Sequence, residues 1–175
     1  MIKKLIKSIY YKIKKMDAND IRLEHLKKIG MQIGDRTYIF SDKLETAEPY
    51  LVTIGNRCMI APGVMFTTHD ASASYYIPGA SDLFGRIIIG DDCFIGMGSI
   101  ILPGVSIANN CIIGAGSVVT KSFNETGIVI AGNPAKKICT IKELYEKNKN
   151  KALNVWGMTY CEKKKYLLEN ENRFK

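Results

Sequence analysis

The chain has 175 residues, which is enough for one domain with a buried core and leaves little for a second. Hydrophobic residues make up 46% of the sequence and charged residues 24%, a balance that excludes a disordered chain. The formal net charge is +8, yet the lysines gather toward the two ends and leave residues 50–120 nearly free of basic side chains. This distribution predicts local anion sites and argues against a nucleic-acid-binding face.

The first 15 residues have apolar positions at three- and four-residue spacing among several lysines, which predicts an amphipathic helix. Its apolar stripe consists of Ile2, Leu5, Ile6, Ile9 and Ile13. Because lysines interrupt the apolar residues, we expect neither a secretory signal nor a membrane span. Two interpretations stay open: the helix packs on the protein or on a neighbouring subunit, or it rests on an anionic membrane surface. A second short helix is predicted over about 18–29, ending at Gly30.

An aliphatic residue then recurs at every sixth position. The unbroken series is Ile89, Ile95, Ile101, Ile107, Ile113 and Val119, and Ile54, Ile60 and Phe66 keep the same period upstream. A period of six is neither helical nor simply alternating. It predicts short flat strands, three of which close a triangular coil with one aliphatic side chain pointing inward from each strand. Small residues next to these positions suit the tight corners.

Two places interrupt the repeat. Ile39 and Ile54 are 15 residues apart, three more than two repeats need, so a bulge is predicted within 41–49. Phe66 and Ile89 are 23 residues apart, five more than three repeats need, so an inserted loop is predicted within 67–86. Insertions in a solenoid cluster on one face and often build the binding site.

The remainder of the chain is expected to be helical, over about 140–150 and 159–171, and these helices are expected to cap the open end of the coil stack. The predicted organisation is therefore an N-terminal helical segment (1–29), a repeat region (30–138) with its inserted loop at 67–86, and a C-terminal helical segment (139–175).

Five cysteines occur, without any C-x-x-C pair. This pattern indicates neither a disulfide framework nor a zinc site. Cys58, Cys93 and Cys111 share one repeat position, which favours small buried side chains. Reduced thiols suit a cytoplasmic protein.

The chain contains two histidines. His25 falls in a helical stretch and is interpreted as a surface or packing residue. His69 lies where the regular repeat gives way to the inserted loop, and an imidazole with a pKa near 6.5 can accept a proton near neutrality. Position alone leaves a functional histidine and a merely solvated one equally open.

The six-residue repeats, Thr67-Thr68-His69-Asp70 at an interruption, and the late Ala131-Gly132-Asn133-Pro134-Ala135-Lys136 together resemble the hexapeptide-repeat acyltransferases. This superfamily includes galactoside, maltose and serine acetyltransferases, xenobiotic acetyltransferases and many polysaccharide O-acetyltransferases. The resemblance covers about residues 30–140. With Glu48-Pro49-Tyr50-Leu51-Val52 it looks closest to the sugar and polysaccharide branch. It implies a mainly β fold, a left-handed parallel β-helix with helices at both ends, and a homotrimer with active sites between subunits.

The resemblance also implies direct acetyl transfer from acetyl-CoA, without a metal, to a hydroxyl of a small sugar or a polysaccharide precursor. His69 matches the catalytic general base. The residues considered for the acceptor site are Asp70, Ser41, Asp42, Glu48 and Asp82. Because neighbouring strand residues face opposite ways, Asp70 is assigned to acceptor binding or loop structure, whereas Asp42, Glu48, Asp82 or a backbone carbonyl are the candidates for orienting the imidazole.

For acetyl-CoA, the positions that match the family's donor contacts are Gly96, Met97, Gly114 and Ala115 at exposed corners, Thr120 and Lys121 near the nucleotide, and Lys136 near the phosphates. A lysine suits phosphate as a point-charge donor, and the alternative for both lysines is an ordinary solvated side chain.

Several alternatives remain. Within enzymes these are N-acetylation of an amino sugar or a xenobiotic, and serine acetylation; outside enzymes, the repeat would form a non-catalytic scaffold. A zinc enzyme of this fold would need three histidine ligands, and the chain has two histidines. We expect a cytoplasmic protein, with peripheral contact at the inner membrane face as an option.

Overall fold

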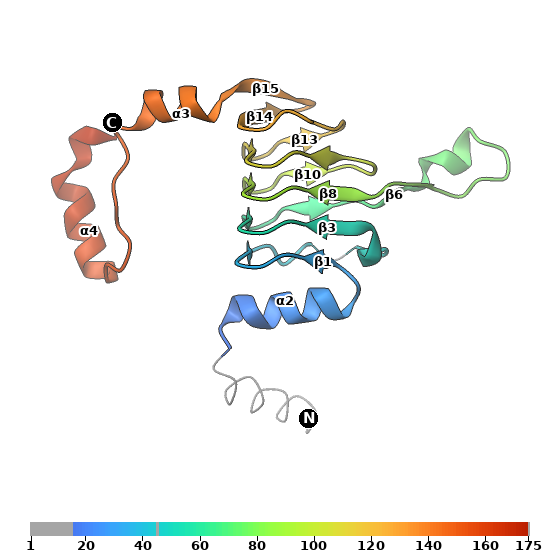
Figure 1. Cartoon of the computed structure of the whole chain (residues 1–175), viewed down its shortest axis with the longest axis horizontal. Coiled ribbons are helices and arrows are strands. Elements are labelled where there is room, and N and C mark those ends of the chain that lie inside the picture. The colour runs from blue at the N-terminus through green and yellow to red at the C-terminus, as the bar shows by residue number, and fades with distance from the viewer. Residues whose placement is uncertain (1–15, 45, 175) are drawn as a thin grey trace.

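The computed structural model describes residues 16–44 and 46–174. The predicted helix over residues 1–15 lies outside the described residues. The remaining chain is mainly β, as predicted, and most of its strands form three sheets that the chain visits in turn (Figure 1). Pairing within these sheets is parallel except at the last strand.

The first sheet contains β1 (Gln32–Ile33), β3 (Val52–Ile54), β8 (Ile87–Ile89) and β11 (Ser106–Ile107). The second contains β2 (Tyr38–Ile39), β4 (Met59–Ile60), β9 (Phe94–Ile95), β12 (Ile112–Ile113), β14 (Ile128–Gly132) and β15 (Ala135–Thr140). The third contains β5 (Met65–Phe66), β10 (Ile100–Ile101) and β13 (Val118–Val119). We call one passage through the three sheets a rung.

The repeat predicts the core correctly. In the second sheet Ile39 pairs with Ile60, Ile60 with Ile95, and Ile95 with Ile113, and each of these side chains is fully buried. The residue before each aliphatic position faces outward. A period of six therefore yields columns of identical apolar positions, because each strand presents one side chain to the interior.

The corners explain the small residues. Gly98 and Gly116 occupy one corner with positive φ values of 68°, a conformation that favours glycine. At the same corner the rungs approach so closely that a Cβ on Gly96 would lie 2.5 Å from the backbone nitrogen of Ala115. The predicted cysteine column is buried, and the Cys58 thiol donates to the carbonyl of Gly90 one rung away, at 3.0 Å.

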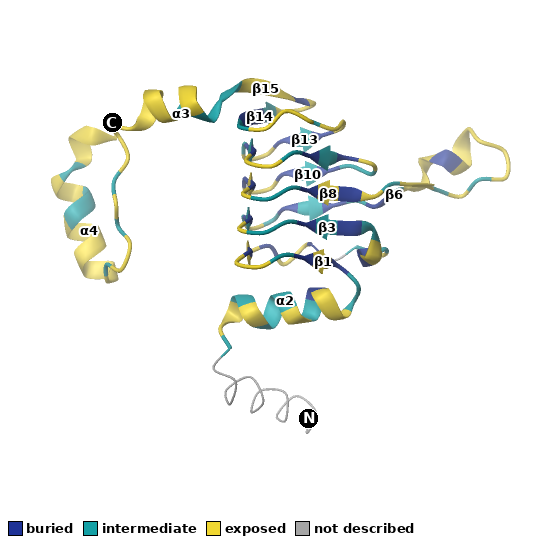
Figure 2. Ribbon diagram, viewed as in Figure 1, coloured by how far each residue is buried: buried dark blue, intermediate teal, exposed yellow. Residues whose placement is uncertain are grey.

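Both predicted interruptions are present. The bulge runs from β2 to β3 and ends in a short 3-10 helix, η1 (Pro49–Leu51). The inserted loop forms a hairpin of β6 (His69–Asp70), the 3-10 helix η2 (Ala71–Tyr75) and β7 (Leu83–Phe84), which projects away from the sheets (Figure 1). Most of the hairpin is exposed, as Figure 2 shows.

Helix α2 (Ala18–Lys28) lies beside the first rung (Figure 1) and begins with a capping box from Asp17 and Asp20. Its Asn19 amide oxygen accepts the backbone N–H of Ile39, at 2.8 Å, and so partners the edge of β2. The helix ends near Gly30, as predicted.

The other end of the stack differs from the expectation. The chain turns at Asn133-Pro134, and β15 then pairs antiparallel with β14, so a strand, rather than the predicted helices, covers the last edge of the second sheet. The predicted boundary between 138 and 139 falls inside this strand. The two helices follow as α3 (Ile141–Asn148) and α4 (Tyr160–Glu169), then η3 (Glu171–Arg173), and α4 stands apart from the sheets (Figure 1).

Among residues 16–44 and 46–174, no helix is long and apolar enough to cross a membrane. The same residues contain no cluster of three or more acidic, histidine or cysteine side chains suited to hold a metal ion.

Candidate functional site

His69 opens the hairpin at the corner between the third and first sheets. Its Nδ1 lies 2.9 Å from Oε2 of Glu48, which belongs to the bulge 21 residues earlier in the chain. The side chain of Glu48 is 14% exposed and that of His69 is 37% exposed. The two interruptions of the repeat therefore meet at one place and form a carboxylate–imidazole pair that still reaches solvent.

The pair has defined charges. Hydrogen bonds from Thr68 and His69 lower the pKa of Glu48, so this carboxylate is ionised near neutrality. The hydrogen bond to Glu48 raises the pKa of His69, and the charges of Glu48, Asp82 and Asp70 add to this effect. Because an ionised carboxylate only accepts, Nδ1 carries the hydrogen, and Nε2 of the neutral ring is left with a free lone pair.

The surroundings are partly aromatic and partly acidic. The Phe84 ring lies opposite His69 in the hairpin, with 5.9 Å between the ring centroids. The Asp70 side chain accepts the backbone N–H of Ser72, at 2.9 Å. This bond is consistent with a role in loop structure, one of the two roles that the sequence predicts for Asp70. Asp82 is half-buried and acts on the His69 charge.

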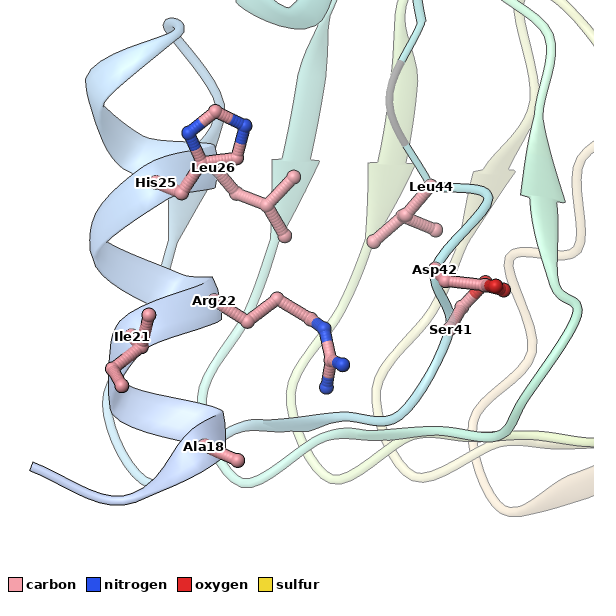
Figure 3. A pocket seen from close by; sticks show the side chains of 8 residues that line it. All are labelled: Ala18, Ile21, Arg22, His25, Leu26, Ser41, Asp42 and Leu44. Carbon is pink, nitrogen blue, oxygen red and sulfur yellow. The ribbon is translucent and has the colours of Figure 1, made fainter. Parts of the chain in front are cut away.

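Ser41 and Asp42 lie side by side in the bulge, but Ser41 is buried, unlike an acceptor-binding residue, whereas Asp42 is exposed. Ser41 is 2% exposed and its hydroxyl donates to the carbonyl of Val64, at 2.7 Å, so it has a structural role within the bulge. Both residues border a cavity of about 460 Å³ between α2 and the bulge, and the Asp42 side chain points away from the helix (Figure 3). The described lining of this cavity includes His25 but neither His69 nor Glu48.

The residues matched to acetyl-CoA fall at two corners. Between the second and third sheets, Gly96, Met97, Gly114 and Ala115 stack in adjacent rungs, with Met97 60% exposed. Lys136 is exposed on β15 opposite Ala131, which approaches Gly114 in the same column. Thr120 and Lys121 are exposed at the corner between the third and first sheets, on the side of His69. Within one chain, the corner that carries Gly96 and Gly114 and the imidazole of His69 therefore lie at different corners.

Sequence reasoning missed Thr46, Thr68 and Phe84. Thr68 is fully buried, and its hydroxyl donates to Glu48 Oε2 at 2.6 Å. Its position next to His69 was the only available signal, because contacts across the bulge depend on the folded chain.

Comparison with known proteins adds four similarities. Residues 86–121 match the family described as bacterial transferase hexapeptide (six repeats). Protein CapG from Staphylococcus aureus is 42% identical over 175 residues, which cover 97% of this chain and 99% of that protein. The hexapeptide-repeat acetyltransferase VCA0836 of Vibrio cholerae, solved with acetyl-CoA, has 28% identity and a TM-score of 0.57 over 63% of this chain and 60% of that one.

The polysialic acid O-acetyltransferase OatWY has 32% identity and a TM-score of 0.56, over 63% of this chain and 53% of that one. The chain thus spans less than two thirds of these two solved structures and nearly the whole of CapG.

Proposed function

Because the chain belongs to the hexapeptide-repeat acyltransferase superfamily, whose matched relatives include named acetyltransferases, we propose that it transfers an acetyl group from acetyl-CoA to a hydroxyl of a saccharide. The observation that carries the proposal is the His69–Glu48 pair, which leaves Nε2 free to accept a proton beside solvent. The donor is supported by the acetyl-CoA in the Vibrio structure, and the saccharide acceptor by the named substrate of OatWY.

The chemistry is direct transfer. Nε2 of His69 removes the proton of the acceptor hydroxyl while that oxygen attacks the thioester carbonyl carbon. The tetrahedral intermediate then expels the CoA thiolate, which takes the proton back from Nε2. The products are an acetyl ester and CoA with a free thiol, and the protein is unchanged. During the step Glu48 accepts from Nδ1–H and stabilises the transient imidazolium charge.

We further propose a left-handed β-helix that assembles as a homotrimer with its sites between subunits. The separation of His69 from the corner that carries Gly96 and Gly114 supports this assembly. In a trimer, this corner of one subunit would lie next to His69 of the neighbouring subunit. Outward-facing apolar side chains on two sheets also favour a neighbour: Tyr38, Met59, Phe94 and Ile112 on the second, and Met65, Ile100 and Val118 on the third.

In this assembly Gly96, Met97, Gly114 and Ala115 would line the pantetheine arm, and Lys121 and Lys136 would face phosphate charges. The cytoplasmic location and the membrane contact of residues 1–15 stay predictions.

The test is release of free thiol from acetyl-CoA by the purified protein, with a panel of sugars, amino sugars, amines and serine as acceptors. We expect turnover with a saccharide hydroxyl, and a loss of about 10²–10⁴-fold in His69→Ala with the oligomer intact. His25→Ala is the matched control, because it removes the other histidine. Wild-type activity in His69→Ala would refute the mechanism. Turnover with amines alone would instead indicate N-acetylation, and no turnover together with no CoA binding would favour a scaffold.

A further inference from the structure

A chain of two threonine hydroxyls lies behind the carboxylate that contacts His69. The Thr68 hydroxyl is 2.6 Å from Glu48 Oε2, and the Thr46 hydroxyl is 2.5 Å from that of Thr68. An ionised carboxylate has no hydrogen to offer, so Thr68 must donate to Glu48. Its oxygen is then free to accept, which makes Thr46 the donor. The hydrogen bonds therefore run in one direction, from Thr46 through Thr68 to Glu48.

These hydrogen bonds join the bulge to the segment between β5 and β6, two parts of the molecule that the repeat does not hold together. Thr46 and Glu48 belong to the bulge, whereas Thr68 lies between β5 and β6 and is anchored by its carbonyl, which accepts the backbone N–H of Gly85 at 2.9 Å. Thr68 is fully buried. The same oxygen of Glu48 receives both Thr68 and His69. A fixed hydroxyl thus restricts where this oxygen can lie, and with it the direction of the imidazole.

Burial alone does not explain this arrangement. A buried hydroxyl needs a partner, and a nearby carbonyl satisfies that need. The neighbouring Thr67 does so, because its hydroxyl lies 3.1 Å from the carbonyl of Ile101, in the same sheet. Thr68 instead donates to a charged side chain that reaches it from the bulge, and hydrogen bonds to ionised groups are the stronger kind.

We propose that Thr68, supported by Thr46, is a positioning residue that holds the Glu48 carboxylate and through it sets the orientation of His69. The kinetic part of this proposal rests on the acetyltransferase function above. The two threonines do not contact the reacting atoms, so they act on the rate of transfer and leave the binding of acetyl-CoA unchanged.

The first test compares kcat for Thr68→Val, which keeps the shape without the hydroxyl, with Thr68→Ser, which keeps the hydroxyl. We expect kcat to fall about tenfold in Thr68→Val, with KM for acetyl-CoA unchanged, and to recover most of its value in Thr68→Ser. Thr46→Val should have a smaller effect. Thr67→Val is the matched control and should keep wild-type kcat. Equal losses in Thr67→Val and Thr68→Val, or no rescue by serine, would overturn the proposal.

A double-mutant cycle separates positioning from general packing. If Thr68 acts through Glu48, Thr68→Val should have little further effect in the Glu48→Gln background. If the two losses in kcat multiply, Thr68 acts independently and the proposal fails.

A second readout does not require activity. In an NMR titration of the whole protein, the raised pKa of His69 should fall toward its ordinary value in Thr68→Val, because Glu48 is no longer held against the ring. An unchanged His69 pKa in Thr68→Val would overturn the positioning role. Absence of thiol release by the wild-type protein would refute the acetyltransferase function instead, and the NMR result would still decide the role of Thr68.

Discussion

Replacing Ile95 by alanine tests whether the period of six describes the core. Ile95 is fully buried and stacks between Ile60 and Ile113, its register partners in the adjacent rungs. The change removes three carbon atoms, which corresponds to about 2.4 kcal/mol at ~0.8 kcal/mol per buried methylene. Parallel pairing holds the rungs in place and limits collapse of the cavity, which adds about 1 kcal/mol. We therefore expect a loss of about 3–4 kcal/mol in the free energy of unfolding.

The assay is urea denaturation at constant protein concentration, since assembly contributes to stability. Ile88→Ala is the matched control, because this isoleucine faces outward on β8 and is 40% exposed. It should lose less than about 1 kcal/mol. Similar losses in the two variants, with the oligomeric state unchanged, would refute the assignment of inward and outward positions.

Three further predictions concern the site. Glu48→Gln removes the charge that raises the pKa of His69. Because the base works unprotonated, the acid limb of the kcat/KM profile should move to lower pH, while the maximal rate falls about 10–100-fold. An acid limb that stays in place would argue against the His69–Glu48 pair. Lys121→Gln and Lys136→Gln should each weaken acetyl-CoA binding severalfold and reduce its salt dependence in calorimetry; unchanged affinity would identify them as solvated lysines. Gly85→Ala places a Cβ 2.1 Å from the backbone nitrogen of Gly104, so it should disturb the hairpin and lower the free energy of unfolding by about 1–3 kcal/mol in thermal denaturation. Gly79→Ala is the control: it has open space around it and should cost about 1 kcal/mol for its positive φ alone.

The regular part of the fold could be predicted because each hexapeptide carries its own information. An aliphatic residue such as Ile101 must face inward from a two-residue strand, and the next strand repeats the requirement. Strand β15 (Ala135–Thr140) lacks this signal, because it does not continue the six-residue repeat. Its pairing with β14 depends on the turn at Asn133-Pro134. For this reason the sequence predicts that the helices after this strand form the cap.

The candidate site was predictable only in part. His69 could be found because it is placed at a break in the repeat. Glu48 was one of several candidates for its partner, since the path of a bulge is decided by tertiary contacts that leave no periodic mark. The burial of Ser41 has the same cause, because its hydroxyl satisfies a carbonyl 23 residues away. Irregular segments carry the chemistry here, and they are the segments in which local sequence says least about position.

The parallel stacking also sets a regular spacing along each corner of the molecule. Neighbouring strands in a sheet are about 4.8 Å apart, so Met97 and Ala115, which occupy the same corner one rung apart, are separated by one such step. An elongated ligand along this edge would meet equivalent positions at that interval. Adding or deleting a whole rung would change the reach of that edge in steps of this size, without altering a single side chain at His69.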